Sequence, residues 1–334
     1  MASQRIPRLA FTLLLCGLVL ILGSCKGAKP RTLDSPLPIA STLVFQSTLP
    51  DETSLATPQP MVTPPALTGN VVYHANSGGA NNIFVLALET GQTNQLTNNG
   101  ADNIEPSWSP DGTRITYACD EGDDYEIYVM NADGTSPNAL TDNSFNDWGP
   151  DWSPDGKQLV FVSDREPYAH LYILDIASGE ITRLHDAPGN EGAPKWSPDG
   201  SRIIFLSDRN AAFNLYTVRP DGTDEQQLTT SEQDDRPNWS PTGKQIVFRR
   251  QTVSSSLFSS AEIFVLNADG TGEQQLTFNR AADDWPVFSP DGQWVVYSVQ
   301  DSGTSWLQVI PASGGAPASL IAGGVAGRAP DWKP

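Results

Sequence analysis

Short runs of alternating apolar and polar residues recur along residues 69–334, and residues typical of turns separate them. The clearest runs lie two residues after a Ser-Pro-Asp-Gly tetrad, in which Pro presets φ, Asp can bond to nearby amides and Gly follows. Alternation with a period of two predicts β-strands, and no helical period appears in this region. The strands predicted after the tetrads are 115–117, 159–161, 203–205, 246–248 and 295–297.

Each tetrad lies between the first and second strands of a unit, and the units share one internal order. A loop leads to another strand, as in Glu126–Met130, then a turn such as Asn131–Gly134, and a short fourth strand ends in Leu-Thr, as at 140–141. Four antiparallel strands in a unit of about 44 residues predict the blades of a β-propeller. The aromatic residues before the tetrads are 44, 44, 43, 49 and 44 residues apart, and we expect them to fill the seams between blades. They are Trp108, Trp152, Trp196, Trp239, Phe288 and Trp332.

The two ends of the repeat region complement each other. The last unit holds only a first strand, at 330–333, whereas the first unit opens directly on a second strand at Asn70–Tyr73. We therefore expect the C-terminal strand to join the N-terminal blade, which removes free sheet edges. The predicted fold is all-β: a six-bladed propeller with four-stranded antiparallel blades over residues 69–334.

The N-terminal residues follow a different pattern. Arg5 and Arg8 precede an apolar run at 9–22, which is shorter than the roughly 20 residues that a membrane-spanning helix needs. This order is typical of a secretory signal. Leu-Gly-Ser-Cys at 22–25 resembles the lipobox of bacterial lipoproteins, which implies removal of residues 1–24 and lipidation of Cys25. We predict an exported protein that is lipid-anchored to the cell envelope, at the outer membrane facing the periplasm or at the cell surface.

Residues 25–68 are predicted to be a tether. Residues 26–68 hold eight Pro and eleven Ser or Thr, and their apolar residues are scattered without a period. Such a stretch cannot bury enough surface to offset the entropy of ordering it, so we expect an extended, disordered linker. Its predicted role is to hold the following domain away from the membrane.

The chain carries a formal net charge of −19, and the predicted signal segment contains Arg5 and Arg8 but no acid. Nucleic acid and anionic lipid headgroups would be repelled by such a surface. We therefore expect no nucleic-acid partner and membrane contact through the lipid anchor only. Cys119 is the one cysteine beyond the predicted leader and Cys25, so no disulfide framework is expected. We expect a monomer.

The Trp-Ser-Pro-Asp-Gly repeats, the Ser-Asp-Arg steps at 163–165 and 207–209 and the Leu-Thr endings resemble the TolB-type propeller repeat. This resemblance covers residues 69–334 and implies a propeller whose central opening binds peptides or proteins, including the Pal lipoprotein. The chain departs from the repeat at Thr242, Phe288 and Lys333, and carries a longer insert at 251–260. Nothing before the repeats has the length or the helical period of the small α/β domain that precedes the propeller of TolB. The resemblance therefore predicts the fold, and does not predict the same function as TolB.

Acidic residues recur three positions before the Pro that opens each first strand, and the loops entering first strands should crowd the opening of the ring. Three interpretations remain open: satisfaction of backbone amides, a rim that binds a partner, or a cation site with Ca²⁺ as the candidate ion. Trp and Arg near these acids are favoured anchors of protein interfaces. The candidate partner-binding residues are Glu105, Asp147, Trp148, Glu191, Asp234, Asp235, Arg236, Asp283, Asp284, Trp285 and Arg328.

Catalytic motifs are absent from the sequence: it has no Gly-x-Ser-x-Gly, no His-Glu-x-x-His and no Cys-x-x-Cys. We therefore predict a non-enzymatic envelope protein, without a cofactor, that binds a protein, a peptide or a polysaccharide at the propeller opening. The alternative is a propeller enzyme, namely a polysaccharide lyase, a hydrolase or the propeller of a peptidase. Such an enzyme would use the acidic ring, with or without a divalent cation.

Overall fold

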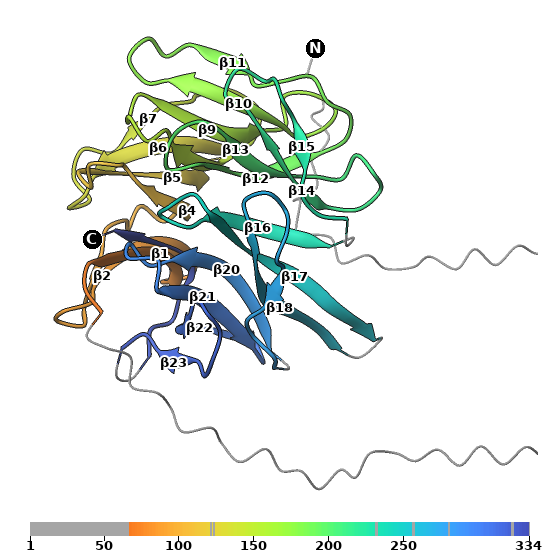
Figure 1. Ribbon diagram of the computed structural model, residues 1–334. Helices are drawn as coiled ribbons and strands as arrows, with labels where there is room; N and C mark the ends of the chain where they lie inside the picture. Colours follow the sequence, from red (N-terminus) through yellow and green to blue (C-terminus); the bar gives the residue numbers. More distant parts are fainter. Residues whose placement is uncertain are drawn as a thin grey trace, which may run out of the picture. The chain divides into compact units, whose positions relative to one another are not determined.

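The computed structural model describes residues 67–333, apart from residues 121, 123, 231–232, 256–257, 280 and 322–323. All of them belong to the second of two compact units, Ala56–Pro334. Every regular element among the described residues is a β-strand, in a propeller arrangement (Figure 1). No helix in this part of the chain is long and apolar enough to cross a membrane. The predicted signal segment, Cys25 and almost all of the tether lie outside the described residues.

Four of the sheets have four antiparallel strands each. The sheet that holds both chain ends contains β24 (Arg328–Lys333), β1 (Asn70–Ser77), β2 (Ala80–Ala87) and β3 (Gln92–Gln95). The next contains β4 (Asp102–Trp108), β5 (Arg114–Asp120), β6 (Tyr125–Asn131) and β7 (Asn138–Ala139). Two more follow, with β8 (Asp147–Trp152), β9 (Gln158–Ser163), β10 (His170–Asp175), β11 (Ile181–Arg183), β12 (Glu191–Trp196), β13 (Ile203–Ser207), β14 (Asn214–Val218) and β15 (Gln226–Gln227).

The remaining eight strands form one continuous sheet, so the prediction of six separate four-stranded blades is wrong. Its strands β17 and β18 have 11 and 10 residues because they include the insert at 251–260. A single parallel pairing, Ala261 with Ala282, joins β18 to β20 and merges two repeats. The strands are β16 (Asp234–Trp239), β17 (Gln245–Ser255), β18 (Phe258–Asn267), β19 (Gln274–Gln275), β20 (Ala282–Phe288), β21 (Trp294–Asp301), β22 (Thr304–Pro311) and β23 (Ala318–Ser319).

The C-terminal strand closes the ring as the sequence indicated. β24 pairs antiparallel with β1, and Trp332 lies opposite Val71. The Trp332 indole is buried and its Nε1 donates to the Thr68 carbonyl at 3.0 Å. Asp331 continues the link, because its carboxylate accepts from the backbone N–H of Trp108 on β4 at 2.7 Å.

The aromatic residues that precede the turns fill seams between neighbouring sheets. Trp196 of β12 packs with Val160, Leu171 and Ile173 of the preceding blade and with Phe205 of its own. Trp152, Trp239, Phe288 and Trp332 are buried in the same way, and Trp108 is partly buried. The core therefore lies between the sheets, and each sheet depends on its two neighbours.

Because β24 closes the ring, substitutions at Trp332 test how much this closure contributes to stability. Replacing Trp332 with Ala is expected to lower the free energy of unfolding by about 3–5 kcal/mol, since a large buried side chain leaves a cavity between two sheets. Trp332→Phe should lower the free energy of unfolding by clearly less. Urea unfolding followed by far-UV circular dichroism measures both values. A loss below about 1 kcal/mol for Trp332→Ala would contradict a closing role for β24.

Candidate functional site

The innermost strand of each repeat carries an unusual backbone conformation directly before its Pro. Six residues at this position have φ between 46° and 63°, in the left-handed region. Five of the six are not glycine, and a residue before Pro is normally driven to extended conformations, so the backbone is strained here. The pairing register shifts at each of these points, which marks a β-bulge. The residues are Glu105, Gly149, Ala193, Arg236, Trp285 and Ala329.

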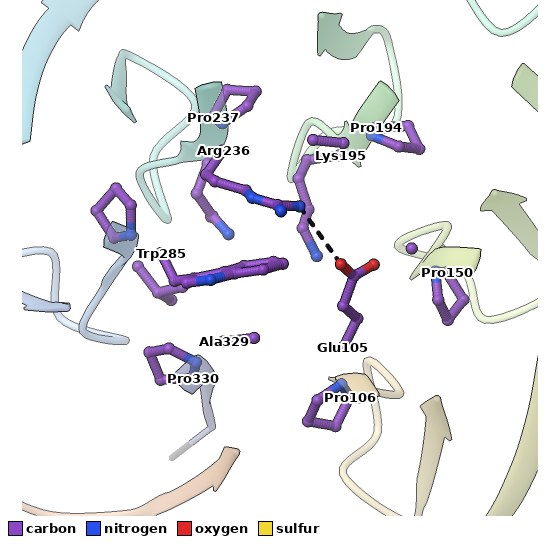
Figure 2. Close-up of a pocket in the computed structure, with 15 residues that line it drawn as sticks. Glu105, Pro106, Pro150, Pro194, Lys195, Arg236, Pro237, Trp285, Ala329 and Pro330 are labelled. Atoms are coloured by element: carbon purple, nitrogen blue, oxygen red, sulfur yellow. Dashed lines mark hydrogen bonds and ion pairs between the residues drawn. The ribbon is translucent and has the colours of Figure 1, made fainter. Parts of the chain in front are cut away.

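The bulges turn these six side-chain positions into a central channel. They line one pocket, together with the prolines that follow them, from strands β4, β8, β12, β16, β20 and β24 (Figure 2). Gly149, Ala193 and Ala329 leave room, whereas Glu105, Arg236 and Trp285 fill it. The remaining cavity is about 50 Å³, enough for a few water molecules. We call Glu105, Arg236 and Trp285 the channel plug.

An ion pair crosses the channel. Arg236 Nη1 lies 3.4 Å from Glu105 Oε1, although the two strands β16 and β4 are three positions apart around the ring. The guanidinium of Arg236 stacks on the Trp285 ring at 3.6 Å from its centroid, as Figure 2 shows. This stacking combines cation–π attraction with burial of the indole face. The plug is therefore charged at its centre and aromatic at one side.

Further charges surround the plug. Arg249 bridges two carboxylates, with Nη1 3.3 Å from Asp235 and Nε 3.7 Å from Asp284. Burial raises the pKa of the Glu105 carboxyl, and the Arg236 guanidinium opposes that rise. Burial also raises the pKa of Asp284, against the pull of Arg236 and Arg249. Lys195 lines the pocket too, but its Nζ is held at 3.0 Å by Asp151.

His74 supports the plug from the side. Its Nδ1 accepts from the backbone N–H of Glu105 at 3.3 Å, and its ring meets Trp285 edge-on. Burial, assisted by Arg328 and Arg236, lowers the pKa of His74 to about 3. The imidazole is therefore neutral at physiological pH and serves as an acceptor for the strained Glu105 backbone.

The acids three positions before each Pro do not line the channel, in contrast to the expected rim. Four of these acids are buried, with at most 2% of each residue exposed: Asp147, Glu191, Asp234 and Asp283. Arg165 lies 3.1 Å from Asp147, Arg209 3.0 Å from Glu191 and Arg250 2.6 Å from Asp234. Each arginine also packs on an aromatic pair of its own blade. In these three sheets the repeated acid is therefore paired with an arginine side chain.

Asp283 has no arginine beside it among the described residues. Asn279 Nδ2 donates to Asp283 Oδ2 at 2.7 Å, while Oδ1 has no hydrogen-bond partner. Glu262 lies in the same buried cluster, where Thr277 donates to it at 2.6 Å. Burial, with the Glu262 charge adding to it, raises the pKa of Asp283 to about 7. This carboxyl is half-protonated near neutral pH.

Comparison with known proteins identifies the repeat. The family model for the TolB β-propeller domain matches residues 55–261, more than half of the chain. The chain belongs to the TolB β-propeller family. TolB from Acinetobacter baumannii is 22% identical, with a TM-score of 0.68 over 80% of this chain and 67% of that one. A protein assigned as TolB from Agrobacterium tumefaciens is 27% identical, with a TM-score of 0.55 over 61% of this chain and 76% of that one.

The same architecture also occurs in an enzyme. An oligogalacturonate lyase from Vibrio parahaemolyticus is 18% identical, with a TM-score of 0.54 over 75% of each chain. At this identity the likeness shows a shared fold. In this TolB-family propeller, no group of three or more His, Cys, Asp or Glu side chains within the described ranges is placed to hold a metal ion.

The remaining predicted residues take other positions in this TolB-family propeller. Trp148 is half-buried and packs against the core between β8–β11 and β12–β15. Arg328 is exposed, and its Nε donates to Ser305 at 3.3 Å. The sequence prediction omitted Lys195 and the small residues of the channel. The residue directly before each Pro, rather than three before it, was the signal that could have found them.

Exposed aromatic residues gather at one end of the TolB-family ring. The register Asp147–Ser163–His170 places the start of β8, the end of β9 and the start of β10 at one end, which we call the mouth. The loops at the mouth carry every large hydrophobic side chain that is exposed in the described part of the chain. They are Phe145, Tyr168, Phe213 and Phe278, and Phe278 is 76% exposed.

The buried Asp147–Arg165 pair gives a stability prediction. Arg165→Met should cost about 3–5 kcal/mol, because it leaves a buried carboxylate without its cation. Adding Asp147→Asn should restore most of the loss, since Asn103 occupies the same position in β4. Thermal or urea unfolding of the single and double variants checks this. The exposed Lys157→Met is the control, and an equal loss there would contradict a specific effect.

Asp283 predicts a pH dependence of stability that is opposite to the one expected for an acid paired with a cation. Its pKa in the folded state, about 7, exceeds the 3.8 of an ordinary Asp, so ionisation opposes folding. The contribution of the neutral form to stability is complete below pH 4 and falls as pH rises through 7. Asp283→Asn should therefore stabilise the protein by about 1–3 kcal/mol at pH 8 and hardly at all at pH 4. Unfolding curves at both pH values check this, and a pH-independent difference would contradict it.

Proposed function

We propose that this protein is a non-enzymatic binding protein of the cell envelope that holds a protein or peptide partner against the mouth of its propeller. One observation carries the proposal: the four exposed large hydrophobic side chains of the described residues all lie on mouth loops. Exposed apolar side chains confined to one end of the ring favour an interaction surface there, and aromatic residues dominate binding energy at interfaces.

The mouth loops and the innermost strands are joined by backbone hydrogen bonds. The Phe213 carbonyl accepts from the backbone N–H of Asp234 at the start of β16, at 3.0 Å, and the Ala169 carbonyl accepts from Glu191 at the start of β12. Phe213 therefore lies next to the start of β16, the strand that carries Arg236 of the plug. Such a surface offers aromatic anchors around a charged centre.

The small volume of the channel defines how a partner would bind. A cavity of about 50 Å³ does not admit a peptide backbone. The partner would bind to the mouth loops and contact Arg236 and Trp285 from that end of the ring, instead of passing through the channel. Arg and Trp in a half-buried setting are favoured anchor residues.

Location and anchoring are part of the same proposal. Membership of the TolB family favours a location in the cell envelope and a binding role. Lipidation at Cys25, with residues 25–68 as the tether, would hold the mouth near other envelope proteins. The net charge of −19 favours a protein partner over nucleic acid.

Site-specific photo-cross-linking in the producing cell tests the mouth. A photoreactive phenylalanine analogue at position 145 or 278 should give a discrete protein adduct, whereas the same group at Lys157, on a turn at the opposite end, should not. Phe145→Ala/Phe278→Ala should reduce the adduct formed from a third mouth position, Tyr168, at least fivefold. Equal adducts from both ends of the ring, or none from the mouth, would count against the proposal.

A further inference from the structure

The channel pocket keeps one carboxylate oxygen free beside its open part. Glu105 Oε1 faces Arg236 at 3.4 Å, whereas Oε2 points away from Arg236 and has no hydrogen-bond partner within the described residues (Figure 2). A Cβ added at Gly149 would lie 3.2 Å from this Oε2. Because Gly149 has no side chain, the space next to the oxygen stays open. The pocket therefore presents a strong hydrogen-bond acceptor to a group that enters it.

The wall around this oxygen is largely apolar. One proline from each innermost strand lines the pocket: Pro106, Pro150, Pro194, Pro237, Pro286 and Pro330. Proline rings have no N–H to donate, and they pack well against methylene groups. A bare Ca²⁺ ion would find one free carboxylate oxygen here, although it takes roughly six to eight oxygen ligands. The wall suits a ligand that carries methylene groups behind its polar end.

Acidic groups outnumber basic ones in and around the pocket. Five carboxylates and four cationic side chains of the described residues interact there, and the buried His74 is neutral. They are Glu105, Asp151, Asp235, Asp284 and Asp331 on one side of the balance, and Lys195, Arg236, Arg249 and Arg328 on the other. One negative charge is therefore left without a counterpart.

The basic residues of the pocket are themselves surrounded by acids. Burial alone would lower the pKa of Arg236, yet this pKa is raised because three nearby carboxylates outweigh the burial. The pKa of Lys195 is raised for the same reason, with Asp151 as its first counter-charge. A negative field of this kind stabilises an added cation and repels an added anion.

The size of the cavity determines which cation fits. About 50 Å³ holds a few water molecules and does not admit the peptide backbone that the amino group of a chain N-terminus brings with it. A lysine ammonium is compact and lies at the end of a flexible four-carbon stem, whereas a guanidinium is wider. The innermost strands begin at the mouth, and Glu105 is the fourth residue of β4. A side chain from a partner at the mouth would therefore approach the pocket with its ammonium end first.

We propose that a lysine side chain of the partner enters the channel beside Gly149 and Ala193, and that its ammonium group pairs with Glu105 Oε2. The methylene groups of that lysine would pack on the prolines of the pocket. This inference rests on the binding role proposed above and specifies a chemical group that the partner must carry.

The test uses the full chain and a small probe, N-acetyl-lysine methylamide, with N-acetyl-norleucine methylamide as its uncharged counterpart. Saturable chemical-shift changes at the Gly149 amide are expected for the lysine compound, with a Kd on the order of 1–10 mM at low salt. The norleucine compound should bind at least tenfold more weakly, because it lacks the ammonium group. Alaninamide, whose ammonium group lies directly on the backbone, should also bind at least tenfold more weakly.

Two variants and one control complete the test. Ala193→Leu fills the open part of the channel and should weaken binding of the lysine compound at least tenfold, while circular dichroism shows a folded protein. Long side chains fit this backbone conformation, since the three plug residues have φ between 52° and 55°. Glu105→Gln removes the charge without shortening the side chain and should weaken binding at least fivefold. Glu180→Gln removes an exposed carboxylate on another blade and should change nothing.

Equal binding of the lysine compound and either comparison compound would overturn the proposal. Unchanged binding in folded Ala193→Leu or in Glu105→Gln would do the same, as would the absence of saturable shifts up to about 50 mM, well above the expected Kd. These outcomes are separate from the test of the binding role. The probes report on the channel without a partner, whereas cross-links from positions 145 and 278 report on a partner at the mouth.

Discussion

A carboxylate that is removed from water needs a neutralising partner, and this requirement organises much of the ring. Asp147, Glu191 and Asp234 are buried within their sheets, and each faces an arginine that reaches back from the second strand or the loop that follows it. The same arginines pack on the aromatic pairs of their blades. One side chain thus balances a charge and covers a hydrophobic surface, which links the inner strand to the outer strands of its sheet.

Departures from this rule mark the places where the chemistry changes. No described arginine lies beside Asp283, where Asn279 donates to the carboxylate, and burial with the neighbouring Glu262 charge raises its pKa to about 7. On the β4–β7 blade Asn103 takes the place of the acid, opposite Cys119, and removes the need for a cation. At the centre, Glu105 and Arg236 balance each other across the channel. The repeat therefore explains which positions are structural and which differ from blade to blade.

The sequence predicted the elements well because the turns that separate them have a local cause. Pro, Asp and Gly at fixed positions determine where strands begin, and the complementary ends predicted the pairing of Trp332 with the β1 strand. The merging of two repeats was not predictable, because it depends on one backbone contact between Ala261 and Ala282. The length of the insert at 251–260 was visible, but not where its strands would reach.

The candidate site was predicted in part, for a geometric reason. Alternation predicts which residues share a face of a strand, but a bulge before each Pro shifts that register by local strain. Glu105, Arg236 and Trp285 were among the predicted residues and lie in the channel, whereas Asp147 and Glu191 are buried and do not line it. Identical spacing from the Pro showed that the acids were equivalent, and could not show which way they faced.

The bulge before each Pro separates the shape of the ring from its chemistry. The same backbone conformation carries Gly, Ala, Glu, Arg and Trp at different points of the circle. Side chains at these points can therefore be exchanged in the course of evolution without rebuilding the strands that present them. The backbone conformation is thus common to all six points, whereas the ion pair of Glu105 with Arg236 and the stacking of Arg236 on Trp285 make the chemistry of the channel particular to this chain.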